Sequence, residues 1–135
     1  MFEPSSKKTC ADAPSGQLLQ GLREFNGGQW YDCHETVEDI WIGSRGEVKH
    51  LLQGIIQVAV ALHHWQNGNY IGAVGLLETG VEYLSCAPQG CMWIDVQGLI
   101  EQANLFRQAL VTGGQEHMHS IDRSLIPQIK TKDVA

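Results

Sequence analysis

Apolar residues recur at intervals of three and four along most of the chain, which is the pattern of helices that bury one face. Turn-forming residues, chiefly Gly, Asn and Pro, separate these segments. The pattern predicts five helices, over residues 17–25, 29–42, 47–66, 70–85 and 96–111. Asp95 is a plausible N-cap for the last of them. No segment shows the two-residue alternation of a half-buried strand, so we expect an all-α protein, a compact antiparallel bundle of about five helices.

The two ends of the chain differ from this helical region in composition. Residues 1–16 are rich in Pro and Ser and have little to bury, so a flexible N-terminal tail is expected before a bundle domain at 17–112. Residues 113–135 form the C-terminal tail. Its apolar positions predict a short docked helix followed by a frayed end, because Pro127 prevents a long helix.

A weak internal repeat appears at an offset of 40 residues. Residues 28–33 and 68–73 share the pattern Gly-x-aromatic-x-x-small, and an apolar-Glu pair follows each of them. This is the pattern of a repeated helical hairpin, but two copies are too few for a solenoid, which favours the bundle. Gly72, Gly75 and Gly80 lie within one predicted helix and indicate close backbone approach, either inside the bundle or across a homodimer.

Composition and charge narrow the classes of partner. The chain has 135 residues, 43% of them hydrophobic, and a formal net charge of −6. Residues 17–113 hold ten acidic and four basic side chains and carry the whole excess. Such a domain repels nucleic acid and anionic membrane surfaces. No apolar run has the roughly 18–20 residues of a membrane span, and the N-terminus lacks the apolar core of a signal peptide. We therefore expect a cytoplasmic protein.

The four cysteines support the same expectation. They contain no CxxC pair and no dense framework, which fits a reducing compartment. Cys86 and Cys91 flank a predicted turn at residues 87–90, so these two could lie close together in a bridge or a metal clip.

Polar residues interrupt the apolar faces of the second and third predicted helices. On a helical wheel His34 and Glu38 fall within the arc of the buried residues of the second helix. The third helix is apolar over most of its circumference, and its remaining arc, about 60° wide, is polar. That arc holds His50, Gln53, Gln57 and His64. Since buried polar groups need partners, we predict that one cluster forms between the two helices, with Trp41 beside it. Its members are His34, Glu38, Gln53, Gln57 and His64.

The run from His34 to Trp41 reads HxxxExxW and resembles the signature of domain-of-unknown-function family 309, a group of small all-helical prokaryotic proteins. The segments around 52–57, 62–64 and 68–73 are similar to the rest of that pattern, so the resemblance spans about residues 18–110. It implies a compact helical bundle and the family's label of predicted metal-dependent hydrolase. By position His34, Glu38, Trp41 and Gln53 match the motif, and either His63 or His64 matches a histidine at the end of the third helix; the wheel favours His64.

Three functional interpretations remain open. In the first, His34, Glu38 and His64, with Gln57, hold a divalent metal such as zinc or manganese, whose bound water attacks a substrate. The motif is HExxE, however, and lacks the second histidine of the zinc-peptidase helix. In the second, the cluster is a buried structural hydrogen-bond network. In the third, the protein is a scaffold or binding module for a small molecule or a protein, with aromatic residues at the helix ends lining the surface.

Overall fold

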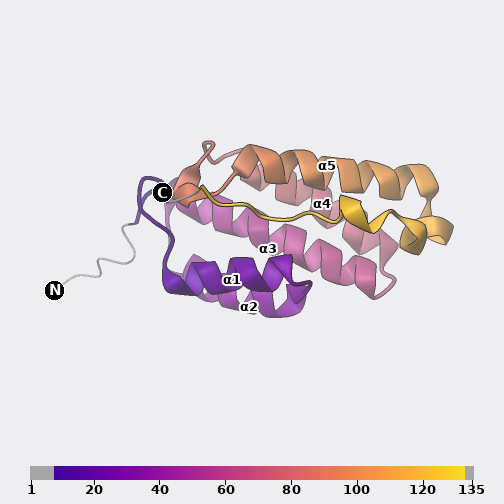
Figure 1. Ribbon diagram of the computed structural model, residues 1–135, viewed down its shortest axis with the longest axis horizontal. Coiled ribbons are helices and arrows are strands. Elements are labelled where there is room, and N and C mark those ends of the chain that lie inside the picture. Colours follow the sequence, from indigo (N-terminus) through magenta and orange to yellow (C-terminus); the bar gives the residue numbers. More distant parts are fainter. Residues whose placement is uncertain (1–7, 133–135) are drawn as a thin grey trace.

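The computed structural model describes residues 8–132, and these form an all-helical protein (Figure 1). Its α-helices are α1 (Gly16–Asn26), α2 (Trp30–Trp41), α3 (Gly46–Gln66), α4 (Tyr70–Leu84) and α5 (Val96–Gly113). The short 3₁₀ helix η2 (Cys91–Trp93) lies between α4 and α5, and two more, η3 (Gln115–Ser120) and η4 (Arg123–Leu125), follow α5. The five predicted helices are confirmed to within two residues at each end. Asp95 is confirmed as the N-cap of α5, where its carboxylate accepts a hydrogen bond from the Gly98 amide at 3.0 Å.

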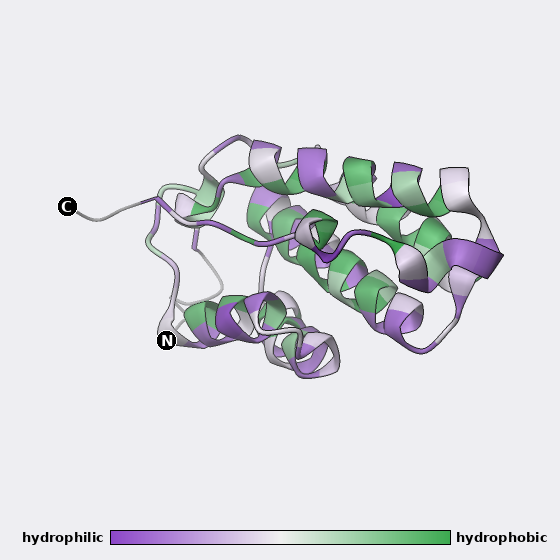
Figure 2. Cartoon of the chain, turned by 45° about the vertical axis from the view of Figure 1, so that its right-hand side comes forward, coloured by the Kyte–Doolittle hydropathy of each residue, from purple (hydrophilic) through white to green (hydrophobic). Residues whose placement is uncertain are grey.

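Helix α3 is the central element of the bundle. It lies between the α1/α2 pair and the α4/α5 pair in Figure 1, and hydrophobic residues cover most of it in Figure 2. Contact with α4 is close because both helices carry glycine where they cross. A Cβ atom added to Gly54 would lie 2.6 Å from Cγ of Leu84, and one added to Gly80 would lie 3.0 Å from Val58. Close approach within the bundle therefore explains Gly80.

The internal repeat corresponds to two helical hairpins with the same turn. Gly28 ends the α1–α2 turn with φ of +80°, and Gly68 ends the α3–α4 turn with φ of +83°. In both turns the backbone amide after the glycine donates a hydrogen bond to a carbonyl in the last turn of the preceding helix. Gln29 donates to the carbonyl of Glu24, and Asn69 donates to the carbonyl of His64, each at 2.8 Å. The glycines are required because other residues rarely adopt a positive φ.

A disulfide holds the segment before α1, which corrects three expectations. Cys10 is bonded to Cys91, 81 residues later, and the Met92 amide donates to the Cys10 carbonyl at 2.8 Å. Residues 8–15 are therefore attached to η2, whereas the sequence predicted a flexible tail over residues 1–16; residues 1–7 of that tail lie outside the described residues. Cys86 has a free, exposed thiol and no bridge to Cys91. Disulfides are typical of oxidising compartments, so the cysteine argument for a reducing compartment does not hold for this chain.

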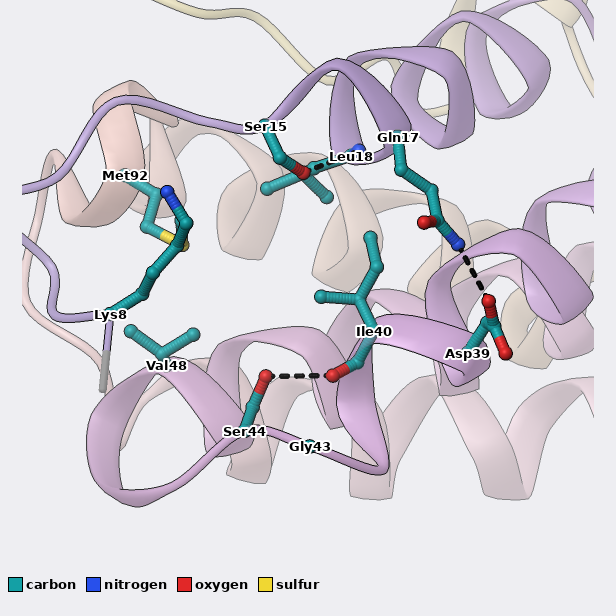
Figure 3. A pocket seen from close by; sticks show the side chains of 10 residues that line it. All are labelled: Lys8, Ser15, Gln17, Leu18, Asp39, Ile40, Gly43, Ser44, Val48 and Met92. Carbon is teal, nitrogen blue, oxygen red and sulfur yellow. Dashed lines mark hydrogen bonds between the residues drawn. The ribbon is translucent and has the colours of Figure 1, made fainter. Parts of the chain in front are cut away.

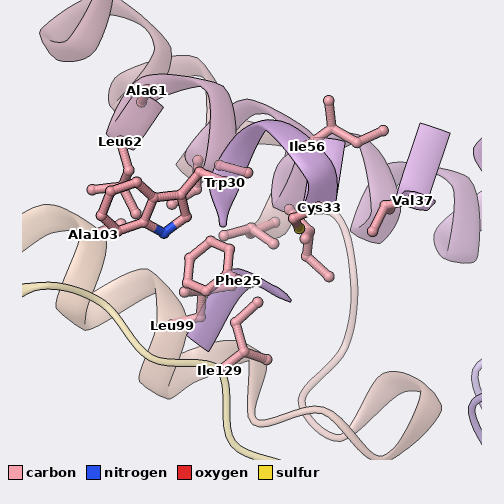
Figure 4. Packing of buried hydrophobic residues seen from close by; sticks show 14 of the residues in the cluster. Phe25, Trp30, Cys33, Val37, Ile56, Ala61, Leu62, Leu99, Ala103 and Ile129 are labelled. Atoms are coloured by element: carbon pink, nitrogen blue, oxygen red, sulfur yellow. The ribbon is translucent and has the colours of Figure 1, made fainter. Parts of the chain in front are cut away.

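The C-terminal segment packs along the bundle and does not fray before residue 132. After η3 and η4 it crosses in extended form in front of the helices (Figure 1). Asn26 holds it at Ile129 through two hydrogen bonds, of 2.7 and 2.9 Å, and Thr131 pairs with Ile94 in an isolated bridge. In Figure 4 Ile129 lies beneath Phe25, in the same buried cluster as Leu99. The short docked helix predicted here is realised as two 3₁₀ helices.

The hydrophobic core takes residues from every α-helix and from the C-terminal segment. Trp65 is its central aromatic residue: its ring packs edge-on against Phe106 at 5.1 Å, and its indole N–H donates to the Met118 carbonyl at 2.6 Å. Within the described part of the chain, none of the helices combines the length and the apolar character that a membrane span requires.

Candidate functional site

The motif residues of α2 lie at the surface. Nε2 of His34 is 3.8 Å from Oε1 of Glu38, one turn later on the helix. The His34 side chain is 23% exposed and that of Glu38 is 50% exposed, and no polar or charged residue in the described chain is fully buried. The expectation of a buried His/Glu/Gln cluster is therefore wrong. Both residues lie at the edge of the buried face of α2, whose centre is occupied by Cys33 and Val37.

An aromatic cluster continues this edge toward the start of α2. The ring centroid of Tyr31 lies 5.5 Å from that of His34 and 5.4 Å from that of His63 on α3. Tyr31 is itself 52% exposed, so the three rings form an open surface. Of the two histidines at the end of α3, His63 is the one beside the motif, whereas the helical wheel favoured His64.

The other end of the motif is covered by a cation. Nζ of Lys49, in the first turns of α3, lies 4.6 Å from the centroid of the Trp41 ring. Gln53 is one turn after Lys49, and Lys49, Gln53 and His63 fall within about 80° of one another around α3. We call this surface the α2/α3 seam. It comprises Tyr31, His34, Glu38, Trp41, Lys49 and His63, which are related by these contacts, and Gln53, which is assigned to it by its angle around α3 alone.

The rest of the predicted cluster faces α4. Gln57 accepts a hydrogen bond from the Thr79 hydroxyl, and Nδ1 of His64 lies 3.4 Å from the side-chain amide nitrogen of Asn69. His50, in the same arc of α3, stacks on Tyr83 at 6.1 Å. The polar arc read from the sequence thus exists, but most of it finds its partners on α4. The predicted convergence of Gln57 and His64 with the motif residues of α2 is wrong.

This separation affects the metal hypothesis directly. Across residues 8–132, no three His, Cys, Asp or Glu side chains come close enough together to hold a metal ion. His34 and Glu38 are neighbours, but His64, the third expected ligand, is turned toward Asn69. A zinc site needs at least three protein ligands. The residues present therefore do not fit the metal centre that the family label implies.

Sequence reasoning missed the contact between Tyr31 and His63. Tyr31 precedes His34 by three residues and so had to lie on the same face of α2, which was a usable signal. Its partner on α3 could not be identified, because adjacent histidines at 63 and 64 differ by about 100° around the helix and only the packing of α3 selects between them.

His34 retains unused hydrogen-bonding capacity. Its Nδ1 atom is buried and has no hydrogen-bond partner among the described residues, while Nε2 faces Glu38. The Glu38 carboxylate is half exposed, and its second oxygen can accept further bonds. Chemically, the seam offers aromatic faces, an imidazole, a carboxylate and an amide in a row along two adjacent helices, which suits recognition of a polar and aromatic surface.

Comparison with known proteins agrees with the motif. The family model described as "Domain of unknown function (DUF309)" matches residues 18–76, so α5 and the C-terminal segment lie outside the match. An uncharacterized protein of Aquifex aeolicus (strain VF5) is 37% identical over 53 residues, which are 38% of this chain and only 16% of that protein. The matched region contains α1 from its third residue, all of α2 and α3, the first half of α4 and every residue of the α2/α3 seam. Residues 18–76 of this chain are therefore a DUF309 domain, whose function is unknown.

Proposed function

We propose that this protein is a non-catalytic binding module that presents the α2/α3 seam to a protein partner. The observation that carries the proposal is the accessibility of the motif residues. Glu38 and Tyr31 are each about half exposed, and the structural network would have required Glu38 to be buried. Residues that are accessible and unnecessary for packing are free to contact another molecule.

The composition of the seam supports a protein partner. Tyr and Trp are enriched in protein interfaces because they supply a large contact area at low cost in conformational entropy. Tyr31 and Trp41 stand at the two ends of the seam, with His34 and Glu38 between them on the same face of α2. This arrangement of aromatic anchors around polar groups is typical of an interface centre.

A hydrolase would be the competing function, and the geometry supports it less well. Its metal centre would need a third ligand beside His34 and Glu38, and His64 is held by α4. Elemental analysis of purified, tag-free protein tests this alternative. Stoichiometric metal that is lost in a folded H34A/E38A double variant would favour the hydrolase over the binding module.

The binding proposal is tested by site-specific photocrosslinking. A benzoylphenylalanine placed at Tyr31, in a lysate of the source organism, should capture a discrete partner protein. The matched control carries the same probe at Leu105 of α5, which is 57% exposed and lies away from the seam. Capture from position 31 and not from position 105 is the expected result.

Purified partner then allows affinities to be compared. Tyr31→Ala and Glu38→Ala should each weaken binding about tenfold, the effect of an interface residue worth about 1.4 kcal/mol. Leu105→Ala should leave the affinity for the partner unchanged, and the melting temperatures of all three variants should stay near that of the wild type. Wild-type affinity in both seam variants would overturn the proposal.

A further inference from the structure

A second site lies on the opposite side of α2 from the seam. It is a cleft of about 300 Å³ between the starts of α1 and α3, the end of α2 and the η2 turn. Figure 3 shows the opening surrounded by Lys8, Leu18, Ile40 and Val48. Small-molecule sites span about 300–1,000 Å³, so the cleft is large enough for a ligand of about ten non-hydrogen atoms.

The floor of the cleft is apolar, and Ser15, Gln17, Asp39 and Ser44 add polar groups around it. Leu18, Val48 and Met92 are buried core residues, and Ile40 packs against them. Leu18, Val48 and Met92 expose only 1–3% of their surface, so a ligand gains stability chiefly from the area of the partly buried Ile40 that it removes from water. The interior therefore favours an alkyl or aryl group.

The rim of the cleft supplies one cation. Lys8 extends along one side in Figure 3, and none of the described acidic side chains forms an ion pair with it. Asp39 also lines the cleft, but Gln17 donates a hydrogen bond to its Oδ2 atom at 3.0 Å, and Ile40 lies between it and Lys8 in Figure 3. Glu47 lines a neighbouring depression with Lys8 and forms no ion pair with it. An unpaired ammonium beside an apolar cavity favours an anion over a cation.

The disulfide fixes this wall of the cleft. Lys8 lies two residues before Cys10, and Met92 directly follows Cys91, so the Cys10–Cys91 bond joins the two segments that carry these lining residues. The hydrogen bond from the Met92 amide to the Cys10 carbonyl, at 2.8 Å, adds a second connection. The backbone segment that carries Lys8 is thereby attached next to the apolar surface in the oxidised protein.

We propose that this cleft binds a small amphiphilic carboxylate, with its carboxylate against Lys8 and its alkyl chain on Leu18, Ile40 and Val48. This inference is independent of the function proposed for the seam, since the two sites share no residue. The expected ligand class is a medium-chain carboxylate, because its charge complements Lys8 and its alkyl chain complements the apolar lining.

Octanoate, below its micellar concentration, is the probe. Protein labelled with [methyl-¹³C]methionine reports binding directly, because Met92 lines the cleft and Met118 lies elsewhere, with its carbonyl bonded to Trp65. The Met92 methyl resonance should shift saturably with a dissociation constant in the millimolar range or tighter, while that of Met118 stays fixed. Octanol, the neutral analogue, should bind at least about fivefold more weakly.

Variants at the rim separate charge recognition from adsorption to apolar surface. Lys8→Gln removes the positive charge and should weaken octanoate binding at least about fivefold, whereas Lys8→Arg keeps the charge and should retain binding. Both variants should fold, because the Lys8 side chain is exposed and its replacement leaves the core intact. Lys49→Gln, a lysine over Trp41 outside the cleft, is the matched control and should bind like the wild type. No saturable Met92 shift, equal binding by Lys8→Gln, or equal affinity for octanol would each overturn the proposal.

Discussion

The carboxylate of Glu38 lies 3.8 Å from the imidazole of His34, yet half of the Glu38 side chain remains in contact with solvent. An exposed pair of this kind is screened by water and contributes about 0–1 kcal/mol to the free energy of unfolding. The acidic member of the motif is therefore a surface group that contributes little to the stability of the fold, whereas Trp41 of the same motif packs against the core.

Replacement of Glu38 by Ala should lower the free energy of unfolding by less than about 1 kcal/mol. The adjacent Val37 is fully buried, so Val37→Ala should lower it by about 2 kcal/mol through lost burial and a residual cavity. Urea unfolding followed by circular dichroism measures both. A loss at Glu38 that equals or exceeds the loss at Val37 would show that the motif is a structural network after all.

The hydrogen bond between Gln57 and Thr79 should couple α3 to α4 by about 1 kcal/mol. A double-mutant cycle with Gln57→Ala, Thr79→Val and the combined variant isolates this energy. The equivalent cycle between Gln57 and Glu38, which the sequence pattern placed together, should give a coupling near zero. Strong coupling in the second cycle would contradict the orientation of α3 described above.

Loss of the Cys10–Cys91 disulfide should destabilise the protein by about 4 kcal/mol, because the bond closes a loop of about 80 residues and so restricts the unfolded chain. Cys10→Ser should show this loss relative to wild type in urea titrations without reductant. Cys86→Ser, which alters an exposed free thiol, is the control and should behave as wild type. With dithiothreitol present, wild type should fall to the level of Cys10→Ser; unchanged midpoints would argue against the bond.

Burial, and secondarily the Glu24 carboxylate, raise the pKa of the Cys33 thiol from 9.0 to about 12. The unfolded chain therefore releases this proton near pH 9, while the folded protein retains it up to about pH 12. Below pH 9 the group has no effect on stability; between pH 9 and 12 it destabilises the fold by about 1.4 kcal/mol per pH unit.

This pH effect is measured against Cys33→Ala, both proteins carrying Cys86→Ser so that no exposed thiolate attacks the disulfide. The free energy of unfolding of the Cys33 protein should fall more steeply above pH 9 than that of Cys33→Ala. Lysine and tyrosine side chains titrate in both proteins, so the difference between the two profiles reports the Cys33 thiol alone. Parallel pH profiles would indicate that the thiol is accessible to water in the folded state.

The all-helical class, the five helices and their ends followed from the sequence alone. Apolar spacing and turn residues such as Gly28 and Gly68 act within a few positions of one another, so they specify local structure without reference to the rest of the chain. The Asp95 cap was predictable for the same reason, because it bonds an amide only three residues away. The HxxxExxW run also sufficed to indicate the family.

Tertiary packing decided the site. A helical wheel gives the angles of Gln57, His63 and His64 around α3, but it does not say which neighbouring helix lies at each angle. Because α3 is packed between two pairs of helices, a rotation of about 100° transfers a side chain from α2 to α4. His63 consequently joins Tyr31, while Gln57 and His64 bond to residues of α4.

The disulfide and the cleft beside it depended even more on the three-dimensional arrangement. Cys10 and Cys91 are 81 residues apart, and no local pattern relates them. Likewise Lys8, Ile40 and Met92 come from three separate segments, and only the folded chain brings them to one cavity. The sequence determined the helices because their hydrogen bonds and caps are local; the structure alone determined which side chains meet, because those contacts depend on how the helices rotate and pack.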